Sequence, residues 1–196
     1  SIERGVLNSL IENKQAIKVD NGTIILSAKG VKKVKNAVIN NSGTIRADGI
    51  TKQGGKIFLT ARNGNISNSG TIAANSDKNK AGLVRVTAEK IEIKDNSSIE
   101  TIGQTSGGLI EIGGSWQNSN KDVYQATTTK IAEGASLDAS TYDFGDGGEI
   151  VVWSDVHNSY SKTTVKGNLR AEGGKIEGNG GRIETSGRSL DINNIK

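Results

Sequence analysis

One short stretch of sequence returns along this chain at a fixed distance. The letters NSGTI occur at residues 41–45 and again at 68–72, so Thr44 and Thr71 are 27 positions apart. Later matching positions are Ser98, Ser136 and Asn168, after further intervals of 27, 38 and 32 residues. Internal periods of about 20–50 residues are typical of solenoids, propellers and other repeat arrays. The spacing therefore favours a structure in which one unit stacks on the next.

Each unit contains two further short patterns. One is a pair of small residues followed by alternating apolar residues, and the other is a weaker alternation just before the NSGTI position. Copies of the first are NGTIILSA (21–28), GGKIFLTA (54–61), AGLVRVTA (81–88), GGLIEIGG (107–114), GGEIVVWS (147–154) and GGRIETSG (180–187). Copies of the second are AVINN, NISNS, IEIKDN, TKIAEG and TTVKGN. A period of two predicts short strands. Three such strands fit one coil of a β-helix better than a four-stranded propeller blade.

The predicted fold class is all-β: a parallel β-helix with three short strands per coil and roughly six coils, built by residues 1–196 as one domain. Copies stack about 4.8 Å apart, and alternate apolar side chains point inward. The expected inward residues are Ile45, Ile72, Ile99, Leu137 and Leu169 on one strand, and Ile57, Leu59, Val84, Val86, Ile110, Ile112, Ile150, Val152 and Ile183 on another. Only 33% of the chain is apolar, which suffices because neighbouring coils bury one another.

The corners of the coil carry small and polar residues. The small pairs, mostly Gly-Gly, indicate a corner that needs φ > 0 or leaves no room for a Cβ atom. Asn41 and Asn68 are expected one above the other, with Asp95 next in line, so that side-chain amides hydrogen-bond along the rod. Gly43 and Gly70 accommodate the turn.

Residues 1–13 (SIERGVLNSLIEN) follow a different pattern. Their apolar residues recur at helical spacing behind a possible cap at Ser1, which predicts a short helix covering an open end or side of the rod. The apolar residues are Ile2, Val6, Leu7, Leu10 and Ile11.

Four stretches in order, GGLIEIGGSWQ, ATTTKIAEGASLDAS, GDGGEIVVWSD and GNGGRIETSG, resemble the region just after the secretion domain of two-partner-secretion exoproteins. These are the filamentous-haemagglutinin-like adhesins of Gram-negative bacteria. The resemblance covers about residues 40–190 and implies a right-handed parallel β-helix. It also implies secretion through an outer-membrane transporter to the cell surface, and attachment to a host glycan or protein. The secretion domain that would bind the transporter is not evident in the sequence.

Side chains that carry catalysis are sparse. There is no cysteine, and the single histidine, His157, has no partners for a zinc or nucleophilic site, so it is expected at the surface. The acidic residues Asp138, Asp143, Asp146, Glu149 and Asp155 spread over a loop and corners, which favours a solvated acidic loop over a calcium site or a glycan-cleaving pair. We expect no enzyme, no cofactor and no metal.

The charge and hydropathy patterns exclude other classes. The net charge of +4 is spread along the chain without interleaved aromatic residues, so no nucleic-acid partner is expected. No apolar run approaches the ~20 residues of a membrane span, so membrane insertion is not expected either.

The aromatic residues are unevenly placed. All but Phe58 fall within residues 116–160, where the repeat interval lengthens, which predicts loops outside the coil. The candidate binding residues are Trp116, Tyr124, Tyr142, Phe144, His157 and Tyr160. Such rings either pack on the flank of the rod or bind a ligand from loops on a rigid scaffold. Trp153 lies within a strand and is expected to be structural.

Asparagine sequons occur at Asn21, Asn40, Asn65 and Asn96, and are possible glycosylation sites.

Three functions follow from these patterns. The leading hypothesis is a non-catalytic shaft or adhesive segment of a secreted adhesin. The alternative is capture of one host protein, such as a haem carrier, through the aromatic loops at 115–160. A remote alternative is a β-helical glycan lyase or hydrolase.

Overall fold

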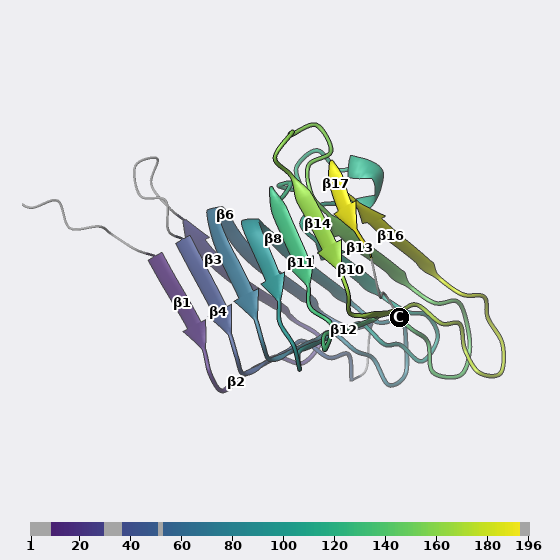
Figure 1. The fold of residues 1–196 in the computed structure, drawn as a ribbon. Helices are drawn as coiled ribbons and strands as arrows, with labels where there is room; N and C mark the ends of the chain where they lie inside the picture. The colour runs from purple at the N-terminus through teal and green to yellow at the C-terminus, as the bar shows by residue number, and fades with distance from the viewer. Residues whose placement is uncertain (1–8, 30–36, 51–52, 193–196) are drawn as a thin grey trace, which may run out of the picture.

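The computed structural model describes residues 9–29, 37–50 and 53–192, and within them the strands wind into a parallel β-helix (Figure 1). All strand pairs in the described ranges are parallel, and each strand away from the ends of the rod pairs with strands from the coils before and after it. The fold predicted from the repeat is confirmed. The coil count also agrees, because six strands stack on the second face of the rod.

Three faces run along the rod, and the chain visits them in the order one, two, three. Face 1 holds β1 (Ser9–Asn13), β4 (Ala37–Asn41), the later part of β6 (Lys56–Asn68), the later part of β8 (Leu83–Ile93), β11 (Thr128–Ile131), β14 (Lys162–Val165) and β17 (Ser189–Asp191). Face 2 holds β2 (Ala16–Lys18), β5 (Thr44–Arg46), β7 (Thr71–Ala73), β9 (Ser98–Glu100), β12 (Ser136–Asp138) and β15 (Asn168–Arg170). Face 3 holds β3 (Thr23–Lys29), the earlier parts of β6 and β8, β10 (Leu109–Ile112), β13 (Glu149–Trp153) and β16 (Arg182–Ser186).

The repeated NSGTI letters mark face 2. Thr44 pairs with Thr71, and Ile45 with Ile72, across β5 and β7. Ile45 and Ile72 are both 0% exposed, so the predicted inward direction of these side chains is confirmed. Burying each one stabilises the rod by roughly 1.5–3 kcal/mol relative to leaving it in water. The recurrence of the letters is therefore a matter of coil stacking.

The N-terminal helix predicted for residues 1–13 is wrong where the structure describes that segment. Residues 9–13 form the strand β1, in which Leu10 pairs with Val38 and Ile11 with Ile39. A strand satisfies the backbone groups along the edge of β4, which a helix would leave unpaired. Residues 1–8, including the proposed cap Ser1, lie outside the described residues.

A ladder of asparagines lines the corner between faces 1 and 2. The Asn13 Nδ2 donates to Asn41 Oδ1 at 2.8 Å, and the Asn41 Nδ2 donates to Asn68 Oδ1 at 2.6 Å. The predicted stacking of Asn41 and Asn68 is confirmed. The expected continuation at Asp95 is wrong, because Ile93 pairs with Asn68 instead.

Two compensating shifts explain that error. In β6 a bulge lies between Ala61 and Asn65, which are four positions apart. Their partners in β8, Ala88 and Lys90, are only two positions apart. The later coil therefore has two residues fewer at the corner between faces 3 and 1. The turn before β9 is longer than the turn before β7 by the same amount. The spacing of 27 between Thr71 and Ser98 thus hides a change of register within the coil.

The small pairs line the corner between faces 2 and 3. A Cβ atom on Gly82 would overlap the carbonyl oxygen of Gly55, and one on Gly148 would overlap that of Gly108. None of these four residues is among the described glycines with positive φ. The pairs are therefore required by the close approach of successive coils, the second of the two reasons expected from the sequence.

Candidate binding surfaces on the rod

Residues 113–127, here called the strap, leave the coil between β10 and β11 and cross the outside of face 3. The Arg182 guanidinium lies 4.3 Å from the centre of the Trp116 ring, and the Gln117 N–H donates to Glu184 Oε2 at 2.7 Å. At the other end of the strap, Arg62 lies 6.0 Å from the Tyr124 ring centre. The strap therefore contacts both β6 and β16, and its short helix η1 (Trp116–Asn118) lies near the β16 end of the rod (Figure 1).

Trp153 holds the strap against face 3. Its Nε1 donates to Gln125 Oε1 at 2.9 Å, and the backbone of Gly114 rests against the indole ring. Trp153 is only 4% exposed although its side chain points away from the coil interior. The ring is part of a second, smaller core between strap and sheet, in line with the structural role expected for it.

A charge pair lies on the same outer face. Arg85 Nε is 2.5 Å from Glu111 Oε2, and Glu111 is 4% exposed. Burial raises the pKa of Glu111, while the hydrogen bond from Arg85 opposes the rise. Removing only one of the two charged side chains would destabilise the fold, because the remaining charge would lie unpaired against an apolar surface.

Residues 154–161 form a second excursion, between β13 and β14. The Asp155 Oδ1 accepts from the backbone N–H of His157, and the Asn158 Oδ1 accepts from that of Tyr160. These two Asx turns shape the segment, which lies outside the coil. Tyr160 in this segment is 87% exposed. Of the candidate aromatic residues it is the one that the structure leaves most accessible, with His157 exposed beside it in sequence.

Tyr142 and Phe144 lie elsewhere. They belong to residues 139–148, which turn from face 2 to face 3 just as residues 74–82 and 171–181 do in other coils. The prediction that this segment is a loop outside the coil is wrong, since the lengthened intervals come from the strap and from 154–161. Tyr142 and Phe144 are 39% and 47% exposed. The six candidate residues therefore come from three separate segments: the strap, residues 154–161 and this corner between faces 2 and 3.

The predicted acidic residues are each engaged by different partners. Asp138 lies 3.8 Å from Arg170, Asp143 accepts from Gln104, Asp146 accepts from Asn179 and Glu149 pairs with Arg182. Asp155 accepts within its own turn. No group of three or more potential metal ligands occurs in the described part of the chain. The expectation of a non-catalytic protein remains a prediction.

Three of the four sequons lie at exposed positions: Asn21, Asn65 and Asn96, whereas Asn40 is half-buried on the outer side of β4. Asn21 and Asn96 have positive φ values of 52° and 61°, a conformation that asparagine tolerates in turns. Glycosylation stays a prediction.

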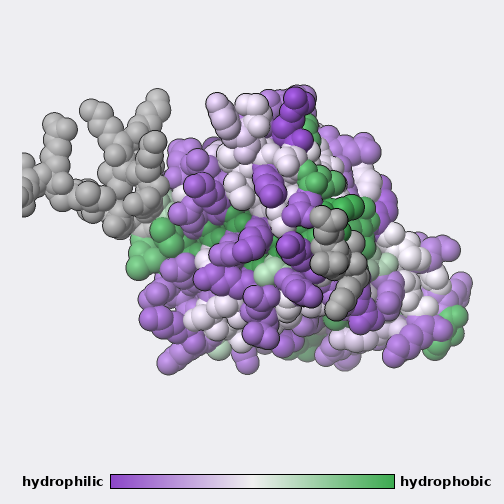
Figure 2. Space-filling view, viewed as in Figure 1, coloured by the Kyte–Doolittle hydropathy of each residue, from purple (hydrophilic) through white to green (hydrophobic). Residues whose placement is uncertain are grey.

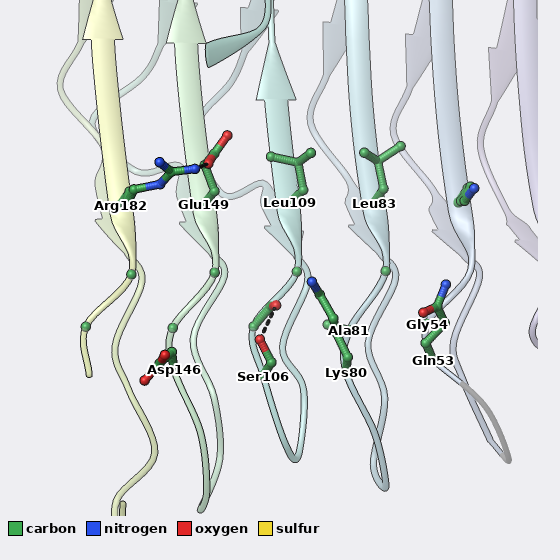
Figure 3. Close-up of a pocket in the computed structure, with 18 residues that line it drawn as sticks. Gln53, Gly54, Lys80, Ala81, Leu83, Ser106, Leu109, Asp146, Glu149 and Arg182 are labelled. Carbon is green, nitrogen blue, oxygen red and sulfur yellow. Dashed lines mark hydrogen bonds and ion pairs between the residues drawn. The ribbon is translucent and has the colours of Figure 1, made fainter. Parts of the chain in front are cut away.

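The sequence reasoning missed a groove that follows the small pairs from coil to coil. It consists of two adjoining hollows with volumes of about 550 Å³ and about 680 Å³, which share Gln53, Gly54, Lys56 and Lys80. Figure 3 shows Lys80, Ser106 and Asp146 on one side of the glycine floor and Leu83, Leu109, Glu149 and Arg182 on the other. Two adjacent residues without side chains, repeated at one corner, were the signal that could have predicted it.

Polar side chains cover most of the surface seen in Figure 2, with apolar patches between them. No helix within the described ranges has the length and apolarity needed to cross a membrane.

Comparison with known proteins finds a similar solved structure. No protein-family model matches the chain, and no curated protein matches it. The crystal structure of the HMW1 secretion domain from Haemophilus influenzae is similar, with a TM-score of 0.79 and 27% sequence identity. The alignment covers 95% of this chain and 47% of that one, so the chain spans about half the length of the solved domain.

The fold and this similarity define the chain as a parallel β-helix related in structure to a secretion domain of a two-partner-secretion exoprotein. The sequence resemblance pointed to the region just after such a domain. The structural similarity is to a secretion domain itself, which changes the expected role.

Proposed function

We propose that this chain is part of the secretion domain of an exoprotein that leaves a Gram-negative cell by two-partner secretion. In this role it is recognised by an outer-membrane transporter, and its final location is the cell surface or the medium. The observation that carries the proposal is the match of 95% of the chain to the HMW1 secretion domain at 27% identity. The ordered stretches in the sequence support export by two-partner secretion independently, while the assignment to the secretion domain itself depends on the structural match.

The architecture suits export in an extended form. Each coil pairs through backbone hydrogen bonds with the coil before it, as Thr44 pairs with Thr71 and Thr71 with Ser98. An edge strand is a template for the next strand, so the rod can grow coil by coil as the chain emerges. The chain has no cysteine, and therefore no disulfide has to form during that growth.

The test is secretion of the full-length polypeptide from its own host in the presence of its transporter. Deletion of residues 9–192 is compared with deletion of a segment of equal length downstream. We expect the first deletion to abolish release into the medium and the second to leave it intact. Normal secretion after loss of residues 9–192, with adhesion to host cells lost, would instead favour the shaft or adhesive role.

A second candidate function is capture of a host protein. It is favoured by the exposure of Tyr160 and His157 on an excursion that projects from the rod. Replacing residues 155–160 with Gly-Ser residues should then abolish binding to that protein without changing secretion. The glycan lyase alternative has no observation in its favour among the described residues.

A further inference from the structure

The groove along the small pairs is continuous over most of the rod. One end lies at Asn21–Thr23 and the other at Arg182, with the shared residues Gln53, Lys56 and Lys80 between them. With coils about 4.8 Å apart, the groove is on the order of 20–25 Å long. That length suits an extended polymer lying parallel to the rod axis.

The floor of the groove uses most of its N–H groups for hydrogen bonds within the rod. Its N–H groups donate to other parts of the rod: Gly54 to Lys80 O, Gly82 to Ala74 O, Gly107 to Asp146 O and Gly148 to Ala139 O. A peptide added to a sheet derives its affinity from main-chain hydrogen bonds. Because these donors are occupied, recognition must come from contact with the flat floor and from the side chains of the walls.

The two walls of the groove differ, since one offers hydrogen-bonding groups and the other includes apolar side chains. Gln53, Ser106 and Asp146 line one side, and Leu83 and Leu109 stand on the other (Figure 3). Sugar rings present hydroxyl groups at their edges and C–H groups on their faces. A side-chain-free floor with polar and apolar walls therefore matches an oligosaccharide better than it matches an extended peptide.

The charges of the groove select among sugars. Lys56 and Lys80 are exposed, and no carboxylate of the described residues forms an ion pair with either. At the far end Arg182 pairs with Glu149, and the Asp146 carboxylate accepts from Asn179. Two positive charges without a carboxylate partner among the described residues therefore lie where the two hollows meet, and the negative charge of Asp146, hydrogen-bonded to an amide, lies nearer the Arg182 end.

From this arrangement we propose that the groove binds an acidic oligosaccharide, with carboxylates of uronic-acid type held by Lys56 and Lys80. The sugar rings lie on the glycine floor, and their hydroxyls contact Gln53 and Ser106. This site does not depend on the proposed role in secretion, because it is formed by the folded rod alone.

The experiment measures binding of tetragalacturonate to the purified chain by titration calorimetry at low salt. The matched ligand is its methyl ester, in which the carboxylates are neutral. Lys56→Gln with Lys80→Gln should weaken binding of the acid at least about tenfold, because two charge-assisted hydrogen bonds are lost. The methyl ester should bind the unmodified chain much more weakly than the acid does.

The control is Lys90→Gln with Lys162→Gln, which removes the same charge from exposed positions on face 1. It should leave the affinity for tetragalacturonate unchanged. Equal loss in both double variants, or no binding of tetragalacturonate at all, would overturn the proposal. Tighter binding of an oligoglutamate peptide than of the sugar would overturn it as well, and would point to a peptide ligand instead. All four substitutions are at exposed lysines, so folding is expected to be retained.

Discussion

Two corners of the coil differ in whether they carry inserted segments. From the third coil onward the corner between faces 2 and 3 spans eight to eleven residues, as residues 74–82, 101–108, 139–148 and 171–181 show, whereas in the first coil it spans only residues 19–22. The corner between faces 3 and 1 is continuous within β6 and β8 but carries the strap and residues 154–161 in later coils. The first corner is fixed because backbones approach too closely to admit a Cβ atom. The second is free because the chain there lies outside the stack.

This difference shows where a β-helix tolerates inserted residues. An insertion at the free corner leaves the coil registers intact, as Leu109 still pairs with Leu83 on one side and Glu149 on the other. The inserted strap then covers Val151 and Trp153 on the outer side of face 3, which adds a second core. At the fixed corner the same change would separate successive glycines and open the stack.

The largest expected effect comes from breaking the fixed corner. Gly82→Ala forces a Cβ atom into the carbonyl oxygen of Gly55, and we expect a loss of about 4 kcal/mol or more in the free energy of unfolding. Gly180→Ala is the matched control, since the nearest atom to its added Cβ would be 3.9 Å away. Urea unfolding followed by circular dichroism measures both. Similar losses in the two variants would contradict the steric account of this corner.

The strap at the free corner should contribute less than the coil itself. Trp153→Ala removes the ring on which Gly114 rests, and we expect a loss of about 2–4 kcal/mol in the free energy of unfolding. Tyr160→Ala, at a ring that is 87% exposed, should change stability by less than about 0.5 kcal/mol. Limited proteolysis should also cut the strap of the Trp153 variant first. Resistance of the strap equal to that of the unmodified protein would show that Trp153 does not anchor it.

The third corner, between faces 1 and 2, should show an intermediate effect. Asn41→Ala removes the middle of the asparagine ladder and leaves the amide groups of Asn13 and Asn68 short of a partner. A loss of about 1–3 kcal/mol in unfolding free energy is expected. Asn40→Ala, on the outer side of the same strand, serves as the control. Equal losses of unfolding free energy in the two variants would show that the asparagine ladder does not stabilise the rod.

The smallest effect concerns pH. Burial raises the pKa of Glu111, so the folded state binds a proton there more tightly than the unfolded chain does. The stability that this group contributes is full below its unfolded pKa and is lost as the pH rises through its folded pKa. Glu111→Gln removes that dependence, and the stability of the variant relative to the unmodified protein should improve between pH 4 and pH 7. A relative change in the opposite direction would contradict the assigned pKa shift.

The fold could be predicted from the sequence because burial repeats with the coil. Ile45, Ile72 and Ile99 occupy the same place in successive coils, and their spacing alone indicates stacking. The strand at 9–13 could not be told from a helix, since the adjacent apolar residues Leu10 and Ile11 fit either period. Residues 9–13 form a strand because they pair with the edge of β4, and this edge exists only in the folded structure.

The candidate site was less predictable, for two physical reasons. An interval gives only the total length of a unit, so the sequence does not tell whether the added residues lie at the Tyr142 corner or at the free corner. The path of the strap depends on contacts such as that of Trp116 with Arg182, which no local pattern encodes. The groove forms where successive coils carry glycine in place of larger side chains, and a pair of glycines in the sequence predicts a corner without indicating a groove.

The most direct test of the difference between corners is a pair of identical insertions. Four residues, Gly-Ser-Gly-Ser, are placed between His157 and Asn158 at the free corner, or between Gly107 and Gly108 at the fixed corner. The free energy of unfolding in urea should change by less than about 1 kcal/mol in the first variant. In the second it should fall by more than about 3 kcal/mol, because the stacked backbones are forced apart. Equal losses at the two corners would contradict the account.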